Sequence, residues 1–409
     1  MLMNLLAGIV LVLMFCILVS VHELGHYLAA RFFNMGVSEF SIGMGRPILK
    51  TFGRRRYKTD DGEEQETLFN VRAWPIGGFV KIVGMEPDDD GNEVQTSGGF
   101  YTKGPWQRIV VLLAGPIFSL LFGWVVLVAL YTTNGDLVPS NKVSEVVKGE
   151  PAAAAGLKVD DRVLSINGHK VESKLDAIYR IRQFDGTRPL DFEVSRDKSV
   201  LHIPITPKLS DEESPSLDQD GLLTGDTKKQ YLVGVNFGVD RVNVGLIGAM
   251  KQAAELPIQQ VSMMVKKFTQ PKVLVNNSTG VVGMAVITKE AVQSGFSTVF
   301  EITGLISISL GIFNLLPIGP LDGGQIFLAL IEVVRRGKRI SMQAQMKFFL
   351  AGLALIISLF LFRNYKDLVQ YVIPGKENLI VGTGKKPTTT SDNNAPNTPA
   401  TNTPDATNK

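Results

Sequence analysis

The sequence predicts a polytopic α-helical membrane protein with four transmembrane helices, a β-hairpin region and one inserted α+β domain. Of its 409 residues, 45% are hydrophobic and 20% are charged, a balance shifted toward lipid relative to an ordinary soluble chain. The apolar residues gather in four stretches, and a mixed polar block separates the second stretch from the third. The four stretches cover residues 1–21, 109–133, 302–321 and 348–362.

The first three stretches are long enough to cross a bilayer, because each lacks charged residues over about the 20 positions that a transmembrane helix requires. The first stretch has no basic leading segment or Ala-x-Ala-like cleavage site and continues directly into His22. We therefore expect a retained helix rather than a signal peptide. The fourth stretch is short between Lys347 and Arg363. This stretch could form a buried helix instead of a transmembrane one. We expect it to span the membrane, with these two side chains extending to the two membrane–water interfaces.

Basic residues gather in two connections, one after the first span and one before the fourth. With four spans these connections lie on the same side of the membrane, and the positive-inside tendency makes that side the cytoplasm. Residues 138–289 are then extracytoplasmic. The basic residues are Lys50, Arg54, Arg55, Arg56 and Lys58 in the first connection, and Arg335, Arg336, Lys338 and Arg339 in the second.

The segments between the spans complete the predicted organisation. Residues 68–71 and 79–83 are β-rich and lie near Gly-Gly turns, which favours a β-hairpin. The α+β domain contains an Asn-Gly turn at Asn167 and a polar inserted loop at 210–229. The predicted units are 1–30 (first transmembrane helix), 31–104 (hairpin region), 105–134 (second transmembrane helix), 138–240 (α+β domain), 241–295 (amphipathic segment), 296–331 (third transmembrane helix), 344–366 (fourth transmembrane helix) and 384–409 (disordered tail).

The amphipathic segment has two interpretations. Apolar residues recur at helical spacing between residues 246 and 268, although Pro257 interrupts the run. The helix either packs beneath the α+β domain or lies on the outer membrane face. Both interpretations stay open.

Charge and cysteine content exclude two kinds of site. The formal net charge is only +3, and no long basic block interleaves with aromatic residues, so a nucleic-acid surface is not expected. Cys16 is the only cysteine, which excludes an intrachain disulfide and a cysteine-ligated zinc site. Any metal site must use His, Asp or Glu.

Residues 22–26 fit the pattern H-E-x-x-H at the end of the first span. On a helix this spacing places His22 and His26 on one face with Glu23 beside them, an arrangement suited to zinc with a glutamate as general base. A polar cap on the helix is the alternative, but an ionisable cluster at membrane depth is costly and usually functional.

A catalytic zinc usually takes three protein ligands. His169 and His202 belong to the α+β domain and are expected at its surface. Asp322 closes a charge-free apolar stretch, after Pro317 and Pro320 have interrupted the helix. Taken alone, Asp322 also fits an interfacial loop, but its combination with H-E-x-x-H favours a third zinc ligand.

Together these motifs resemble the site-2 protease family of zinc intramembrane metalloproteases, and within it the RseP-type bacterial branch with one PDZ domain. The resemblance extends to about residue 367. It rests on residues 22–26, on N-x-x-P-x-x-x-L-D-G at 314–323, and on a PDZ-like Gly-Leu, Asp, Ile-Asn-Gly series at 156–168. Asp160 departs from the PDZ pattern, where glycine is commoner, and suggests a changed turn.

The resemblance implies Zn²⁺, a bacterial inner-membrane location with the active site toward the cytoplasm, and single-pass substrates such as anti-sigma factors or signal-peptide remnants. It also implies that the hairpin is membrane-associated and holds an unwound substrate on an edge strand. From its place between the second and third spans, the PDZ-like domain is expected to gate access by size, and recruitment of substrates by their carboxyl termini is the alternative. Ser119 stands where the family pattern has asparagine, which leaves a hydrogen-bond detail open. The implied substrate-binding residues are Gly43, Gly45, Gly78 and Asn314.

Two other functions remain as alternatives. A membrane-anchored PDZ scaffold or pseudoprotease would keep the metal residues without catalysis, and a metal-ion transporter would also use intramembrane His and Asp. The presence of all four expected catalytic residues argues against a pseudoprotease. Glu23 discriminates a protease from a transporter, because hydrolysis requires a base and transport has no evident need for one.

Overall fold

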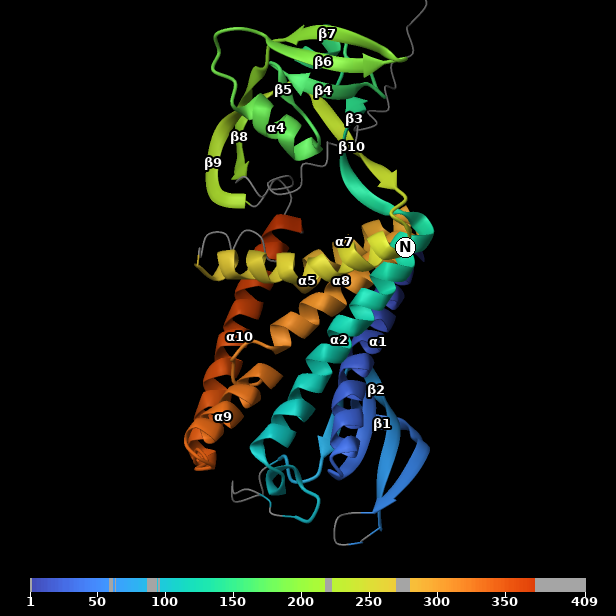
Figure 1. Ribbon diagram of the computed structural model, residues 1–409, viewed down its shortest axis with the longest axis vertical. Coiled ribbons are helices and arrows are strands. Elements are labelled where there is room, and N and C mark those ends of the chain that lie inside the picture. Colours follow the sequence, from blue (N-terminus) through green and yellow to red (C-terminus); the bar gives the residue numbers. More distant parts are fainter. Residues whose placement is uncertain are drawn as a thin grey trace, which may run out of the picture.

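The computed structural model describes residues 2–58, 62, 64–86, 94, 96–217, 223–269 and 280–371. A helical bundle forms the middle of the molecule, with an α+β domain at one end and a β-hairpin beside the other end (Figure 1). The predicted tail at 384–409 lies outside the described residues.

Four helices of the bundle are long and apolar enough to cross a membrane. Their candidate spans are Met3–Phe32, Pro105–Asn134, Phe296–Asn314 and Met342–Tyr365. The prediction of four transmembrane helices is thus supported, including the short fourth one, because its helix continues beyond Lys347 and Arg363. The helices are α1 (Leu2–Phe32), α2 (Pro105–Asn134), α8 (Phe296–Asn314) and α10 (Met342–Tyr371).

The third predicted unit, 296–331, consists of two helices rather than one. Helix α8 ends at Asn314, and α9 (Asp322–Val334) begins at Asp322. Pro317 and Pro320 lie between them, and each removes a backbone N–H and restricts the residue before it, so the helix cannot continue. The break places Asp322 in the first turn of a new helix.

The segment after α1 is an antiparallel hairpin of β1 (Val37–Lys58) and β2 (Glu64–Ile82). Both strands are long and irregular, so residues 39–42 of β1 pair with two stretches of β2, 68–71 and 78–81. Phe40 and Phe69 from the two strands meet the ring of Tyr27 edge-to-face, with centroids 5.9 and 5.6 Å away. These aromatic contacts fix the sheet against α1.

A charged pair lies inside the hairpin. Arg72 Nη2 donates to Glu39 Oε1 at 2.5 Å, and Arg72 also bonds the carbonyl of Gly45. Burial alone would raise the pKa of Glu39, but hydrogen bonds from Ser41, Asn70 and Arg72 outweigh it and lower the pKa. The pair therefore stays ionised and ties the bend of β1 to β2.

The α+β domain is built on a six-stranded sheet in the order β10-β3-β4-β6-β7, with β5 paired to β4. Its core contains the fully buried side chains of Val163, Ile166 and Phe192. The elements are β3 (Asp136–Val146), α3 (Pro151–Ala154), β4 (Arg162–Ile166), β5 (His169–Lys170), α4 (Lys174–Arg182), β6 (Leu190–Arg196), β7 (Ser199–Ile205), β8 (Lys208–Leu217), β9 (Leu223–Leu232) and β10 (Val235–Val242).

Turn chemistry explains two features of this domain. Asn167 and Gly168 have φ of 51° and 75° and join β4 to β5, as expected for a two-residue Asn-Gly turn. Asp160 has φ of 74°, a left-handed conformation that glycine favours. Its carboxylate forms an ion pair with the ammonium group of Lys142 at 2.8 Å. Of the expected loop at 210–229, residues 210–217 and 223–229 instead belong to the paired strands β8 and β9, and the remainder lies outside the described residues.

Two helices, α5 (Gly245–Thr269) and α7 (Val281–Ser294), follow the domain, and the short 3-10 helix η1 (Phe100–Thr102) precedes α2. Ala249 and Ala253 of α5 are fully buried against α2 and α8. Ile247 and Ile258 are 84% and 71% exposed. One face of α5 therefore packs on the bundle and another presents apolar side chains outward.

Candidate metal centre

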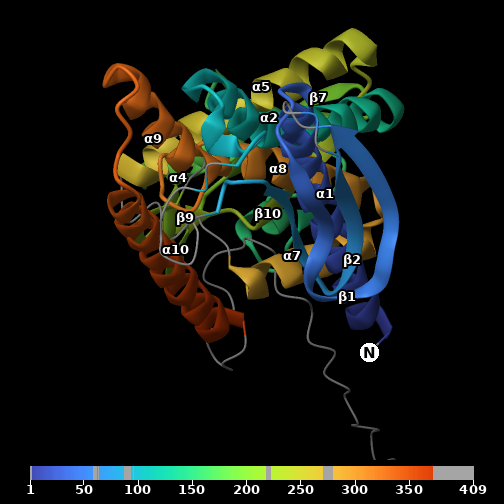
Figure 2. The same ribbon diagram turned by 90° about the horizontal axis from the view of Figure 1, so that it is seen from below.

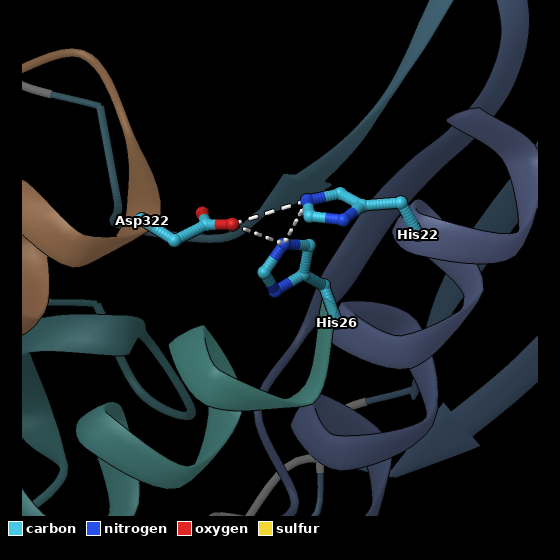
Figure 3. A group of neighbouring side chains, drawn as sticks. All are labelled: His22, His26 and Asp322. Carbon is cyan, nitrogen blue, oxygen red and sulfur yellow. Dashed lines mark hydrogen bonds and ion pairs between the residues drawn. The ribbon is translucent and has the colours of Figure 1, made fainter. Parts of the chain in front are cut away.

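His22, His26 and Asp322 converge although 300 residues separate the first from the last (Figure 3). His22 and His26 lie one turn apart on α1, and Asp322 opens α9. His22 Nε2 lies 3.0 Å and His26 Nε2 lies 3.3 Å from Asp322 Oδ2, and the two Nε2 atoms are 3.3 Å apart. The predicted metal ligands therefore form a nearly equilateral triangle of donor atoms.

The triangle fits a zinc ion. Ligand atoms at about 2.0–2.1 Å from one tetrahedral zinc lie about 3.3 Å from one another, close to the three spacings seen here. Two imidazoles and one carboxylate also match a common donor set of catalytic zinc, which leaves one position for water. Within the described residues, this trio is the group of His, Cys, Asp and Glu side chains that can hold a metal.

Both imidazoles are oriented by α2 through their second nitrogen. His26 Nδ1–H donates to the carbonyl of Val111 at 2.9 Å, and His22 Nδ1 lies 3.0 Å from the hydroxyl of Ser119. A carbonyl can only accept, so the proton of His26 must sit on Nδ1 and its Nε2 lone pair faces the centre. With Nε2 of His22 left for a metal, its Nδ1–H donates to Ser119. Such partners fix the tautomer and the ring orientation of metal ligands.

Small residues let α1 and α2 come close enough for these bonds. A Cβ on Gly115 would overlap the ring of His26, and one on Gly25 would overlap the carbonyl of Ala114. Pro116 follows Gly115 and cannot donate a backbone hydrogen bond, which locally interrupts the ladder of α2. The Gly-Pro pair therefore makes room for the second imidazole.

Glu23 lies between the metal ligands and strand β2. The backbone N–H of Val80 faces the Glu23 carboxylate. A Cβ on Gly78 would lie 3.3 Å from Val19 Cγ1 and 3.9 Å from Glu23 Cγ. The predicted base and the predicted glycine of the hairpin are thus neighbours.

Strand β2 runs along α1, as the view from below shows (Figure 2). The Cys16 thiol donates to the carbonyl of Pro75 at 3.1 Å, so the contact between helix and strand begins before Gly78. On one side residues 78–81 pair with β1. In the part of the chain that the structure describes, no third strand joins this sheet. The other side of this stretch is an edge beside Glu23.

The other predicted residues take different places. Gly43 and Gly45 have φ of 88° and 86°, and a Cβ on either would press on Trp74. They shape the bend of β1 next to the pair of Ile42 with Gly78. The Asn314 amide donates to the carbonyl of Leu310 at 3.0 Å, at the end of α8.

The two remaining histidines lie in the α+β domain. His169 belongs to β5, and His202 of β7 is exposed and pairs with Asp191 at 2.9 Å. Both are thus surface histidines of this domain, as expected.

Sequence reasoning missed Val111 and underestimated Ser119. Ser119 is fully buried, and Ser307 of α8 donates to its carbonyl at 2.7 Å. A serine among apolar residues was a visible signal in the sequence. The backbone carbonyl of Val111 gives no such signal, because every residue has a carbonyl.

Sequence comparisons relate this chain to metalloproteases. Residues 10–359 match the sequence model of a family described as Peptidase family M50. A Campylobacter jejuni protein that carries the description zinc metalloprotease is 30% identical over 367 residues, which cover 88% of this chain and 93% of that protein. One from Mesorhizobium japonicum, described likewise, is 31% identical over 370 residues, 86% of this chain and 95% of that protein. The metalloprotease MmpA of Caulobacter vibrioides is 29% identical over 386 residues, 87% of this chain and 93% of that protein.

Proposed function

Because this chain belongs to peptidase family M50 and is a zinc metalloendopeptidase, we propose that it cleaves single-pass membrane proteins in or near their transmembrane segment. The observation that carries the proposal is the depth of the metal centre. His22 and His26 lie within the candidate span Met3–Phe32, about two thirds and four fifths of the way along it. A peptide bond has to reach this depth to be cut.

In this proposal His22, His26 and Asp322 hold the zinc, and Glu23 is the general base. Bound zinc supplies a Lewis acid that activates water and polarises the scissile carbonyl. The Glu23 carboxylate accepts the proton of that water and delivers it to the leaving amine.

The free edge of β2 is the proposed substrate-binding element. Helical peptide bonds are hydrogen-bonded to their own chain, so a transmembrane substrate must unwind before cleavage. Residues 78–81 offer backbone groups that can pair with an extended peptide, and their neighbour Glu23 then lies at the cleaved bond. Gly43 and Gly45 shape the adjoining bend, and Asn314 lies eight residues before Asp322 in the same interrupted segment.

The hairpin is proposed to enter the membrane. Three large apolar side chains near its bend are exposed in the isolated chain, Met44 by 47%, Ile48 by 63% and Trp74 by 66%. Lipid would cover these side chains at little cost.

The proposed orientation places the α+β domain outside a bacterial inner membrane and the metal centre toward the cytoplasm. The paired ends of β1 and β2 and the connection between α9 and α10 lie at the end of the bundle away from the domain (Figure 1). The end of β1 carries Arg54, Arg55 and Arg56, and the α9–α10 connection carries the second basic cluster. The positive-inside tendency therefore assigns that end to the cytoplasm.

The α+β domain is proposed to be PDZ-like and to gate access by size. It stands between α2 and α5 at the extracytoplasmic end, where a bulky substrate domain would meet it first. Replacing residues 138–240 by a short flexible linker should therefore permit cleavage of full-length substrates that the intact enzyme spares. Slower cleavage of trimmed substrates would instead indicate a receptor for carboxyl termini.

Anti-sigma factors and signal-peptide remnants are the proposed substrates, since both are single-pass and both expose a trimmed end. The two alternatives, a scaffold and a metal-ion transporter, differ from a protease in one requirement. Neither needs Glu23, whose position beside the three ligands favours hydrolysis.

The test is Glu23→Gln in membranes that contain a tagged single-pass substrate. We expect no cleavage, an intact substrate that co-purifies with the enzyme, and unchanged zinc content, because Glu23 is not a ligand. Glu290→Gln on the exposed face of α7 is the control and should cleave normally. Cleavage by Glu23→Gln near the wild-type rate would exclude the assigned mechanism.

A further inference from the structure

A cavity of about 440 Å³ is enclosed by side chains of elements that meet away from the α+β domain. Its walls come from η1, α2, α9 and the beginning of α10, together with the segment that follows β2. The volume falls within the range of about 300–1,000 Å³ that is usual for ligand pockets. None of the three metal ligands lines it, so it is a separate space.

The cavity nevertheless adjoins the metal centre. Gly319 and Gln325, three residues before and three after Asp322, line it. Leu112 also lines it and directly follows Val111, whose carbonyl holds His26. The turns that support two of the three proposed ligands are therefore also walls of the cavity.

Strand β2 leads toward the same cavity. It passes Glu23 at residues 78–80, ends at Ile82, and turns through the bond from Met85 N–H to the Ile82 carbonyl at 3.2 Å. Met85 and Glu86 then form part of the cavity wall. A peptide extended along the edge of β2 and continuing past Glu23 in this direction arrives at the cavity.

The walls are suited to a large apolar side chain. Leu328, Met342, Met346 and Phe349 from α9 and α10 contribute much of the surface. Methionine side chains adapt to differently shaped partners because they are flexible and polarisable. The charges of Arg108 and Glu332 are paired at 2.5 Å, so neither wall charge requires an oppositely charged occupant, although Arg108 Nε has no hydrogen-bond partner among the described residues.

We propose that this cavity is a specificity pocket that receives a large apolar side chain of the substrate, several residues to one side of the cleaved bond. This inference rests on the proposed function, because it assumes an extended peptide on the edge of β2. It adds a sequence preference to an enzyme whose strand pairing recognises mainly the backbone.

The test uses synthetic single-span peptides in detergent, each varied at one position near the cleaved bond among Ala, Leu, Phe and Asp. Pairs of peptides compete in one reaction, so the ratio of their kcat/KM values does not depend on the amount of active enzyme. We expect one position at which Phe is preferred to Ala by about tenfold, a discrimination typical of an apolar pocket.

Leu328→Trp fills the cavity and should reduce that ratio to about one, whereas Leu328→Ala should keep the preference for Phe. Leu330→Trp is the matched control, since Leu330 lies on α9, is 40% exposed and is not part of the wall. If Leu328→Trp fails to bind zinc, Met346→Trp fills the cavity from α10, with the 55% exposed Leu350 as the site of its control.

The proposed specificity pocket would be refuted if no peptide position showed a preference for a large apolar side chain. It would also be refuted if the Leu330→Trp control changed the ratio of kcat/KM values as much as Leu328→Trp does. A preference that survives both filling variants would overturn it as well. The Glu23→Gln variant distinguishes failure of the pocket proposal from failure of the proposed protease function. If that variant is inactive while the peptides show no preference, the protease proposal stands and only the pocket is lost.

Discussion

Arg108 and Glu332 form a buried ion pair that joins the beginning of α2 to the end of α9. Arg108 Nη2 and Glu332 Oε2 are 2.5 Å apart, and the side chains are only 4% and 8% exposed. Arg339 adds a second bond to Glu332, from Nε to Oε1 at 3.3 Å. Helix α9 is thus held at Asp322 in its first turn and at Glu332 in its last.

Glu332→Ala should lower the free energy of unfolding by about 3–5 kcal/mol, because Arg108 is left as a buried charge without its carboxylate. The double variant Arg108→Met/Glu332→Leu should lose less than the single variant, since no charge is stranded. Denaturant titration in detergent measures both.

Glu66→Ala serves as the control for the ion pair. Glu66 is 34% exposed and its partner Arg56 is 75% exposed, so its removal should cost less than about 1 kcal/mol. Equal losses for Glu66→Ala and Glu332→Ala would contradict the role assigned to burial.

Ser119→Ala should weaken zinc binding about 10- to 100-fold, because Nδ1–H of His22 loses its acceptor in a buried place. Competition with a chelator measures the zinc affinity directly. Ser307→Ala is the control, since its hydroxyl bonds the Ser119 carbonyl and not the ring. A similar loss in both variants would indicate a packing effect instead.

The sequence was sufficient for features that depend on local spacing. Four spans followed from apolar length, and the pairing of His22 with His26 followed from the helical repeat. Asp322 was predicted because a single carboxylate ended an apolar stretch near Pro317 and Pro320, and because H-E-x-x-H at residues 22–26 required a third ligand. Each pattern is visible along the chain itself, so no knowledge of the fold was needed.

Features that depend on contacts between distant segments were not predictable. The bond from His26 to Val111 joins residues 85 positions apart and uses a backbone carbonyl, which no residue type encodes. Helix α9 was merged with the third span because its residues are as apolar as those before the break. The space that Gly115 leaves for His26 becomes visible only once α1 and α2 are packed.

Gly115→Ala should abolish both zinc binding and peptidase activity, because the added Cβ would overlap the ring of His26. Zinc content of the purified protein and cleavage of a model peptide are the measurements. Gly8→Ala on α1 should have no effect, since no atom lies within 4 Å of its added Cβ.

Gly123→Ala distinguishes displacement of the ligand from poor helix packing. Its Cβ would press on Gly304 and Ile308 of α8, on the same helix as Gly115 but against no metal ligand. Folded Gly123→Ala protein should still contain zinc. If it lost zinc as completely as Gly115→Ala, the effect would be one of packing alone.

Cysteine labelling tests the proposed orientation in the membrane. After Cys16→Ala, single cysteines at Arg55, Arg336 and Lys170 occupy exposed positions at the two ends of the molecule. An impermeant reagent outside intact cells should label only the one at Lys170, and permeabilised cells should allow all three to react. Labelling of all three in intact cells would refute the four-span arrangement.

Gly78→Ala tests the role of β2 at the metal centre. The added Cβ would lie 2.8 Å from the carbonyl of Ser41 on β1 and 3.3 Å from Val19 Cγ1 on α1, so the strand must shift relative to β1 and α1. A displacement of about 1 Å is enough to misplace a paired substrate relative to Glu23, and we expect kcat/KM to fall by tenfold or more. The zinc content should not change, because no ligand is touched.

Gly53→Ala on β1 is the matched control for this strand. Its Cβ would meet the nearest atom, on the ring of Phe69, at 3.6 Å, an ordinary van der Waals distance. The control should therefore retain activity as well as zinc. If Gly78→Ala were also fully active, the edge beside Glu23 would not be where the substrate binds, although the metal centre could remain as described. If instead it lost zinc together with activity, the strand would support the ligands rather than the substrate. Only the separation of the two measurements, zinc kept and cleavage lost, is expected of an edge strand that presents the peptide bond to the base.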